Sequence, residues 1–298
     1  MPRIARFTIA AEKISSYFSS RTEQVFSFKE LSEIFDNRRH LWNLAPTYTL
    51  EKFISNLEKA NILSQSKLKI TWPKKDYPQK KNTEEKTLYI KANATALDVA
   101  FSLHPKAYLS HYTALAINDL TEQIPKTVYV TIEQSPKLNS SIESQNAIDH
   151  AFLKPQRISQ KETEFKGEKI IILNGKYTNR FGILERNGWN YTNVYRTLID
   201  CAVRPSYSGG VQSVLNAYIE AKNLEGFSIN KFIVTLNKMN FIYPYHQAIG
   251  FYMERAGYNE NWLNRLLSME KEFDFYLDYN INHKEYDPKW KLYYPKGL

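Results

Sequence analysis

The sequence predicts an α+β protein with two domains, residues 1–92 and 93–298. Three amphipathic helical segments followed by two short strands fill the first domain, and helices mixed with a few strands fill the second. The net charge also differs between these two predicted domains. Residues 1–92 hold 17 Lys or Arg against 10 Asp or Glu, whereas the rest of the chain holds 23 against 21. This asymmetry indicates that the first domain meets a polyanion.

The first two helices follow from apolar spacing and a capping signal. Apolar residues recur at three- and four-residue steps from Phe7 to Phe18, which is typical of one face of a helix. Ser27 and Glu30 have the spacing of a capping box, so a second helix begins there. We expect this helix to end near residues 36–37 and to bury three side chains: Phe28, Leu31 and Phe35.

A third helix is predicted from Thr49, with Leu50, Phe53, Ile54 and Leu57 on its buried face. Its other face carries groups that can donate hydrogen bonds to phosphates and base edges. We predict that these residues bind DNA: Thr49, Lys52, Ser55, Asn56 and Lys59. Residues 37–48 separate the second and third helices by more than the roughly four residues of a tight helix-turn-helix. Either a short extra helix or an enlarged turn must fill that gap.

Two strands, residues 68–72 and 87–90, follow the helices, and this order is that of a winged helix-turn-helix. The connection between them is rich in lysine and interrupted by proline. We expect it to lie along a phosphate backbone through Lys74, Lys75, Lys80 and Lys81. The alternative is that this small domain contacts protein and that its lysines only face water.

The second domain mixes two strands with many helices. Strands are predicted at residues 126–132 and 169–173, and an extended chain at the C-terminus. Helices are predicted at these ranges: 95–103, 107–118, 194–203, 211–222, 229–239 and 246–255. The first domain is therefore expected to precede an α+β domain with a small sheet.

Two stretches of this domain contain sequence motifs that also occur in a known family. One runs from Tyr108 through Ser110 and His111 to Pro125, and the other runs from Tyr195 to Gly210. The chain resembles the C-terminal domain of AbiEi-like antitoxins, from type IV toxin–antitoxin (abortive infection) systems. In that family a Ser-His-x-x-Ala-Leu helix leads into Leu-Thr-x-Gln-x-Pro and a strand. Later landmarks, at residues 243–257 and 290–297, extend the similarity over residues 92–298.

The resemblance implies an antitoxin that counteracts a cognate nucleotidyltransferase-type toxin, with or without a stable complex, as part of phage defence. It also implies repression of the shared promoter by binding at inverted repeats. Seven residues carry the family motifs: Ser110, His111, Arg196, Asp200, Arg204, Gly209 and Gly210. We expect a structural role for them, and a direct antitoxic role is the alternative. The family commonly has an acidic residue where this chain has Tyr195, which argues against an ion pair there.

Catalytic motifs are sparse. The six histidines show no metal-ligand spacing, and the sequence spells no phosphate loop, dinucleotide fingerprint or nucleophile elbow. Two triplets, Glu164–Lys166 with Asp149 upstream and Glu220–Lys222 with Asp200 upstream, match the metal-dependent nuclease pattern only weakly. We expect no enzyme activity, no cofactor and no metal. A metal-dependent nuclease remains the less favoured alternative, and a winged-helix regulator with a sensing C-terminal domain is the main one.

Arg196 and Asp200 are spaced to pair along one helix, and we expect them to anchor the loop that follows it. The lone cysteine, Cys201, lies in an apolar helical segment and is expected to be a buried structural thiol. It also fits a reducing cytosol. The N-terminus lacks the apolar run of a signal peptide, and no segment is long enough to span a membrane. We therefore expect a cytoplasmic protein without a membrane partner.

Overall fold

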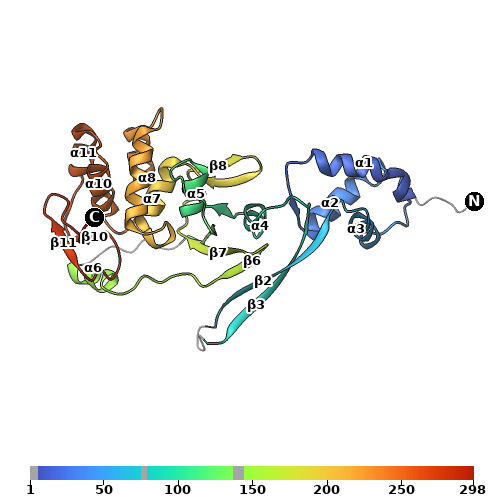
Figure 1. Cartoon of the computed structure of the whole chain (residues 1–298), viewed down its shortest axis with the longest axis horizontal. Coiled ribbons are helices and arrows are strands. Elements are labelled where there is room, and N and C mark those ends of the chain that lie inside the picture. Colours follow the sequence, from blue (N-terminus) through green and yellow to red (C-terminus); the bar gives the residue numbers. More distant parts are fainter. Residues whose placement is uncertain (1–5, 75–78, 137–143) are drawn as a thin grey trace, which may run out of the picture. The chain divides into compact units, whose positions relative to one another are not determined.

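The computed structural model describes residues 6–74, 79–136 and 144–298, and it is an α+β fold (Figure 1). The chain forms two compact units. The N-terminal unit comprises residues 1–105, 160–171 and 187–189, and the C-terminal unit comprises residues 106–159, 172–186 and 190–298. The N-terminal unit thus takes in α4 (Ala96–Ser102) and the hairpin of β6 (Glu162–Phe165) with the first half of β7 (Glu168–Gly175).

The first three helices of the N-terminal unit surround an aromatic core. They are α1 (Arg6–Ser20), α2 (Phe28–Arg38) and α3 (Leu50–Lys59). Ser27 and Glu30 form the predicted capping box of α2. Phe28, predicted to be buried, is 50% exposed, because as the first residue of α2 it lies outside the face on which Leu31 and Phe35 pack.

Residues 39–49 form an enlarged turn rather than an extra helix. Trp42 is buried there and stacks on Phe53 of α3, with 5.5 Å between ring centroids and an interplanar angle of 19°. Leu44 is also buried. This aromatic stacking, together with the buried Leu44, fixes the turn against the helices without a regular hydrogen-bonded element.

A long antiparallel hairpin follows α3 (Figure 1). Its strands are β2 (Ser64–Pro73) and β3 (Lys81–Ile90), both longer than the sequence predicts, and they pair from Ser64 with Ile90 to Pro73 with Lys81. β3 also pairs with β1 (Val25–Phe26), and β2 pairs with β6 where Thr71 faces Glu162. Ten residues of strand span about 33 Å. The far end of the hairpin therefore lies about 30 Å from the end next to α3.

The sheet of the C-terminal unit has the order β7, β5 (Thr127–Glu133), β4 (Tyr108–Leu109), β9 (Trp189–Thr192) and β8 (Ile183–Arg186). A second sheet has the order β10 (Phe275–Tyr276), β12 (Leu292–Pro295) and β11 (Lys284–Asp287). Its helices are α5 (His111–Ile117), α6 (Gln145–Phe152), α7 (Val194–Val203), α8 (Val211–Asn223), α9 (Ile229–Met239), α10 (Tyr245–Arg255) and α11 (Glu260–Leu267). The short 3-10 helix η1 (Pro205–Tyr207) joins α7 to α8.

The predicted helix over residues 107–118 is wrong in its first turn. Tyr108 and Leu109 instead form β4, which pairs with Thr131 and Val130 of β5. The helix starts only at His111, whose φ of 52° is left-handed and marks the sharp change from strand to helix. The strand wins because both of its side chains are fully buried beside β5.

Helices α7, α8 and α10 pack together in the core of the C-terminal unit, and the landmark stretches near the C-terminus meet there. A Cβ added to Gly250 of α10 would lie 2.1 Å from the ring of Trp290, so only glycine allows this approach. The side-chain amide of Gln247 donates to the Trp290 carbonyl at 2.8 Å. Phe251, Tyr252 and Leu266 are fully buried and belong to this core.

Candidate nucleic-acid interface and buried arginine network

Helix α3 presents a polar face opposite its buried one. Thr49 caps the helix by accepting a hydrogen bond from the Lys52 amide at 3.3 Å. Lys52 and Lys59 are exposed, and Ser55 is half-buried between them. The Asn56 amide donates to the Tyr48 hydroxyl, and the Lys52 ammonium lies 5.4 Å from the centroid of the same ring. The structure therefore gathers all five predicted residues of this helix on one surface.

The predicted lysines of the hairpin lie at its far end. Lys74 and Lys80 are exposed, with the Lys74 amide donating to the Lys80 carbonyl at 2.8 Å, and Lys75 falls outside the described residues. Lys81 forms an ion pair with Glu162 at 3.3 Å, and Lys169 pairs with the same carboxylate at 2.5 Å. Lys169 and Lys81 lower the pKa of Glu162. The hairpin end is therefore partly neutralised by β6, which the sequence pattern does not reveal.

The two family motifs meet in the C-terminal unit around one buried cation. Arg196 lies on α7 and is 2% exposed. Its guanidinium donates to Asp200 at 3.1 Å, to the Thr178 hydroxyl at 2.8 Å, to the Phe181 carbonyl at 2.5 Å and to the Tyr108 hydroxyl at 2.9 Å. An ion pair to Glu133 at 3.6 Å completes the set. The two carboxylates and three neutral oxygens thus face all five donors of the guanidinium.

The pKa values of Glu133 and Asp200 shift in opposite directions beside this cation. Burial would raise the pKa of Glu133, but hydrogen bonds from Thr178 and Arg180 and the charge of Arg196 hold it below its usual range. Burial raises the pKa of Asp200, and the charge of Glu133 also raises it, although Arg196 and Arg204 act in the opposite direction. For Arg196 itself, burial would lower the pKa, but Asp200, Tyr108 and Glu133 raise it.

This network corrects the expectation that Arg196 and Asp200 anchor the loop after their helix. Arg196 instead holds the segment Thr178–Phe181, which precedes it in the chain. The following loop is shaped by glycine: Gly209 and Gly210 have φ values of 81° and 87°, a conformation that favours glycine. The Gly210 amide also donates to the Pro205 carbonyl at 2.9 Å.

Ser110 and His111 form the second part of the network. The Ser110 hydroxyl lies 2.6 Å from the Thr131 hydroxyl and 2.9 Å from Nδ1 of His111. His111 is 5% exposed and meets Tyr207 edge to face, with 5.5 Å between ring centroids. Burial, with Arg204 and Arg196 nearby, lowers the pKa of His111, so the ring is neutral at physiological pH.

A cavity of about 50 Å³ lies where the motif residues meet, lined by His111, Arg196, Asp200 and Arg204 among others. It is large enough for a water molecule or two and too small for an organic substrate. Arg204 sits at the end of α7 and donates to the Asn174 carbonyl at 3.2 Å. The motif residues therefore organise the interior of this unit.

Sequence reasoning missed Tyr108, Glu133 and Thr178, the remaining side-chain partners of Arg196. They come from β4, the end of β5 and a loop, up to 88 positions away along the chain. Only Tyr108 had a local signal, because it stands two residues before Ser110 in the first motif. Glu133 ends a strand and Thr178 lies in a loop, and neither position has a periodic pattern.

The two nuclease-like triplets lie in different elements, one on β6 and the turn after it and the other on α8. Glu164 and Phe165 belong to β6, and Lys166 begins a tight turn with a φ of 51°. Lys222 of the other triplet donates to the Ala256 carbonyl at 3.0 Å. Among the described residues, no group of three His, Cys, Asp or Glu side chains could hold a metal ion. Cys201 is buried as predicted, and burial raises the pKa of its thiol.

Comparison with known proteins identifies a shared fold. No protein-family profile matches the chain, and no curated protein matches it in sequence. The crystal structure of the RV2827C protein from Mycobacterium tuberculosis is similar, with a TM-score of 0.55 and 10% identity over 96% of this chain and 91% of that one. At this identity the similarity concerns the fold alone. No helix in the described ranges combines the length and apolar character needed to cross a bilayer.

Proposed function

We propose that this chain is a DNA-binding antitoxin of the type IV class, with DNA binding in the N-terminal unit and toxin antagonism in the C-terminal unit. In this proposal it represses the promoter it shares with a nucleotidyltransferase-type toxin and carries out no catalysis itself. We also propose that the N-terminal unit is a winged helix-turn-helix.

The observation that carries the DNA-binding part is the outer face of α3. Its buried side holds the helix in an aromatic core, while Lys52 and Lys59 point into solvent on the opposite side, seven residues or about 10 Å apart. Cations held at such a spacing on a rigid helix can contact phosphates on either side of a groove. Ser55 and Asn56 lie between them and supply groups that can read base edges.

The antitoxin part of the proposal rests on the family resemblance. The burial of the motif residues suggests that they act by shaping the C-terminal unit. Ser110, His111, Arg196 and Asp200 are far apart in sequence yet belong to one buried cluster. In this proposal the motif shapes the unit, and the surface of the unit antagonises the toxin.

Growth of cells that express the adjacent gene from an inducible promoter tests the antitoxin part. We expect the adjacent gene to arrest growth and the full-length chain to restore it. A toxic neighbour that this chain fails to rescue would contradict antitoxin function and favour a regulator with a sensing C-terminal unit. Full-length protein is required because a start near Asn93 would separate β6 from β2, its partner within the N-terminal unit.

Titration of fluorescent promoter DNA with the purified chain tests the DNA-binding part. We expect sequence-specific binding. The logarithm of the association constant should fall linearly as the logarithm of the salt concentration rises. Equal affinity for promoter and unrelated DNA at all salt concentrations would contradict sequence-directed repression.

A further inference from the structure

The small cavity beside Arg196 in the C-terminal unit has an excess of positive charge in its lining. Three cations, Lys176, Arg196 and Arg204, line it together with one carboxylate, Asp200. Protein oxygens already engage all the donors of the Arg196 guanidinium, so this group has none left for a ligand. Lys176 and Arg204 are therefore the cations that can meet a molecule in the cavity.

Lys176 and Arg204 keep hydrogen-bond donors that no protein group uses. Both side chains are half-buried, and each donates to one backbone carbonyl, Lys176 to that of Asn240 and Arg204 to that of Asn174. Within the part of the chain that the structure describes, neither forms an ion pair. Burial lowers the pKa of Lys176, because a partly desolvated cation without a counter-ion is costly. An anion between the two side chains would supply the missing counter-charge.

Asp200 adds a hydrogen-bond acceptor to the same cavity. Its Oδ2 atom accepts from Arg196 at 3.1 Å, whereas Oδ1 has no hydrogen-bond partner among the described residues. Burial raises the pKa of Asp200, and the charge of Arg204 opposes this shift, which agrees with their shared place in the lining. A ligand that contacts all three side chains therefore needs acceptors for Lys176 and Arg204 and a donor for Asp200.

We propose that this cavity binds inorganic phosphate. At neutral pH the ion carries negative charge and at least one proton, so its oxygens accept from Lys176 and Arg204 while its O–H group donates to Asp200. Arginine and lysine are both common phosphate-binding residues. The cavity of about 50 Å³ has no room for an organic group, which favours the free ion over a phosphate ester. This site does not depend on the proposed antitoxin function.

Bound phosphate would join three segments that lie far apart in the sequence. Arg204 follows the last residue of α7, and Lys176 follows the last residue of β7. The Asn240 carbonyl, which accepts from Lys176, belongs to the residue after α9. Because phosphate binds these segments only when they are folded together, the melting temperature should rise with phosphate concentration.

Isothermal titration calorimetry of the full-length chain in phosphate-free buffer tests the site. We expect one phosphate per chain with a Kd of about 1 mM or lower. Arg204→Gln and Lys176→Gln should each weaken binding about tenfold or more, because each removes a charge-assisted hydrogen bond. The matched control Lys222→Gln also removes a cation that donates to a backbone carbonyl, but outside this cavity. It should bind phosphate as the wild type does.

Two other anions test the chemistry of the site. Sulfate resembles phosphate in shape but carries no proton at neutral pH, so it has no donor for Asp200 and should bind about tenfold or more weakly. Glycerol phosphate should not bind, because its organic group does not fit. Equal affinity for sulfate would overturn the role of Asp200, and equal affinity for glycerol phosphate would overturn the assignment to the free ion.

The variants also decide whether the site exists. The proposal is overturned if phosphate shows no saturable binding, or if both cavity variants bind it as tightly as Lys222→Gln does. Should Arg204→Gln fail to fold, Lys176→Gln decides alone, and its melting temperature should respond less to phosphate than that of the wild type. All these results leave the antitoxin function untouched, since growth rescue tests it separately.

Discussion

The two units use positive charge in opposite ways. On α3 the cations Lys52 and Lys59 are exposed and stand outside the folded core. In the C-terminal unit Arg196 is 2% exposed and surrounded by the oxygens of five residues. An exposed lysine costs the fold little and remains free to contact a polyanion, whereas a buried guanidinium must satisfy its donors inside the protein. The difference teaches that the same formal charge is a binding element in one unit and a folding element in the other.

The largest expected effect comes from removing the buried cation. Arg196→Met leaves Glu133 and Asp200 without their cation, so we expect a loss of about 3–5 kcal/mol in the free energy of unfolding. Urea denaturation followed by circular dichroism measures it. The matched variant Lys52→Met, at an exposed position, should change stability by less than about 0.5 kcal/mol. Equal losses in the free energy of unfolding at the two positions would contradict the distinction between an exposed and a buried cation.

A buried histidine of the C-terminal unit should make the stability of the protein depend on pH. His246 is 9% exposed, and burial lowers its pKa to about 4. Between about pH 6.5 and pH 4 the unfolded chain binds a proton that the folded chain does not, so stability falls as the pH is lowered through this window. The expected loss is about 3 kcal/mol, from about 2.5 pKa units at 1.36 kcal/mol each. His246→Gln should flatten the dependence of urea midpoint on pH, and an unchanged slope would contradict this account.

The exposed cations of α3 should affect binding without affecting the fold. Replacing Lys52 and Lys59 with alanine removes two phosphate contacts, so the slope of log affinity against log salt should become shallower by about 2. Affinity should fall for all DNA sequences alike. Fluorescence anisotropy at several salt concentrations measures both quantities. An unchanged slope would mean that α3 does not face the DNA backbone.

The lysines at the hairpin end should have the smallest effect. Lys81 is already paired with Glu162, and the hairpin end lies about 30 Å from the end next to α3. Alanine at Lys74, Lys75, Lys80 and Lys81 together should weaken binding at all sequences and reduce the salt slope by about 1, less than the α3 pair. A larger loss than from α3 would make the hairpin end the principal contact. No loss at all would exclude it from the interface.

Local patterns predicted much of this fold. The capping box at Ser27 and the helix over residues 194–203 follow from rules that act over a few residues. What the sequence could not supply came from long-range contacts. The pairing of Tyr108 with Thr131 turned the start of a predicted helix into strand, and Thr178 reaches Arg196 only through the folded chain.

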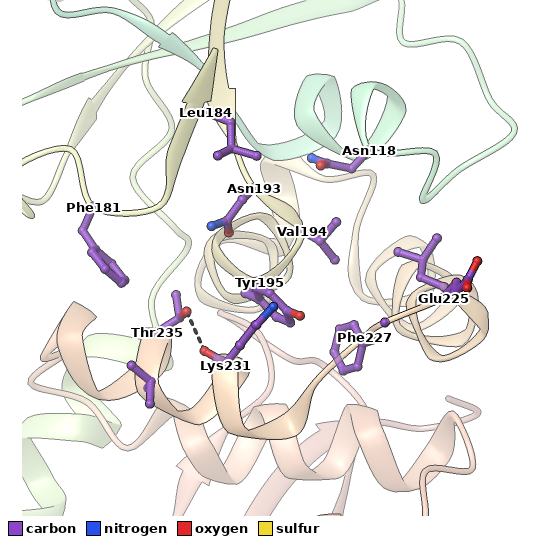
Figure 2. A pocket seen from close by; sticks show the side chains of 13 residues that line it. Asn118, Phe181, Leu184, Asn193, Val194, Tyr195, Glu225, Phe227, Lys231 and Thr235 are labelled. Atoms are coloured by element: carbon purple, nitrogen blue, oxygen red, sulfur yellow. Dashed lines mark hydrogen bonds between the residues drawn. The ribbon is translucent and has the colours of Figure 1, made fainter. Parts of the chain in front are cut away.

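The same limit applied to the sites. The residues of α3 could be assigned because amphipathic spacing separates the buried face from the exposed one. The neutralisation of Lys81 by Glu162 involves partners 81 positions apart, which no periodic signal predicts. A cavity of about 490 Å³ (Figure 2) likewise combines residues from α7, α9, the loop between α8 and α9 and the segment around β8.

The most direct test of the division between the units is a separation of function in the full-length chain. One strain carries the toxin under an inducible promoter and a reporter under the native promoter, together with the chain bearing Lys52→Ala and Lys59→Ala. The account predicts that this variant loses repression of the reporter and still restores growth as well as the wild type. Loss of growth rescue in proportion to the loss of repression would contradict it.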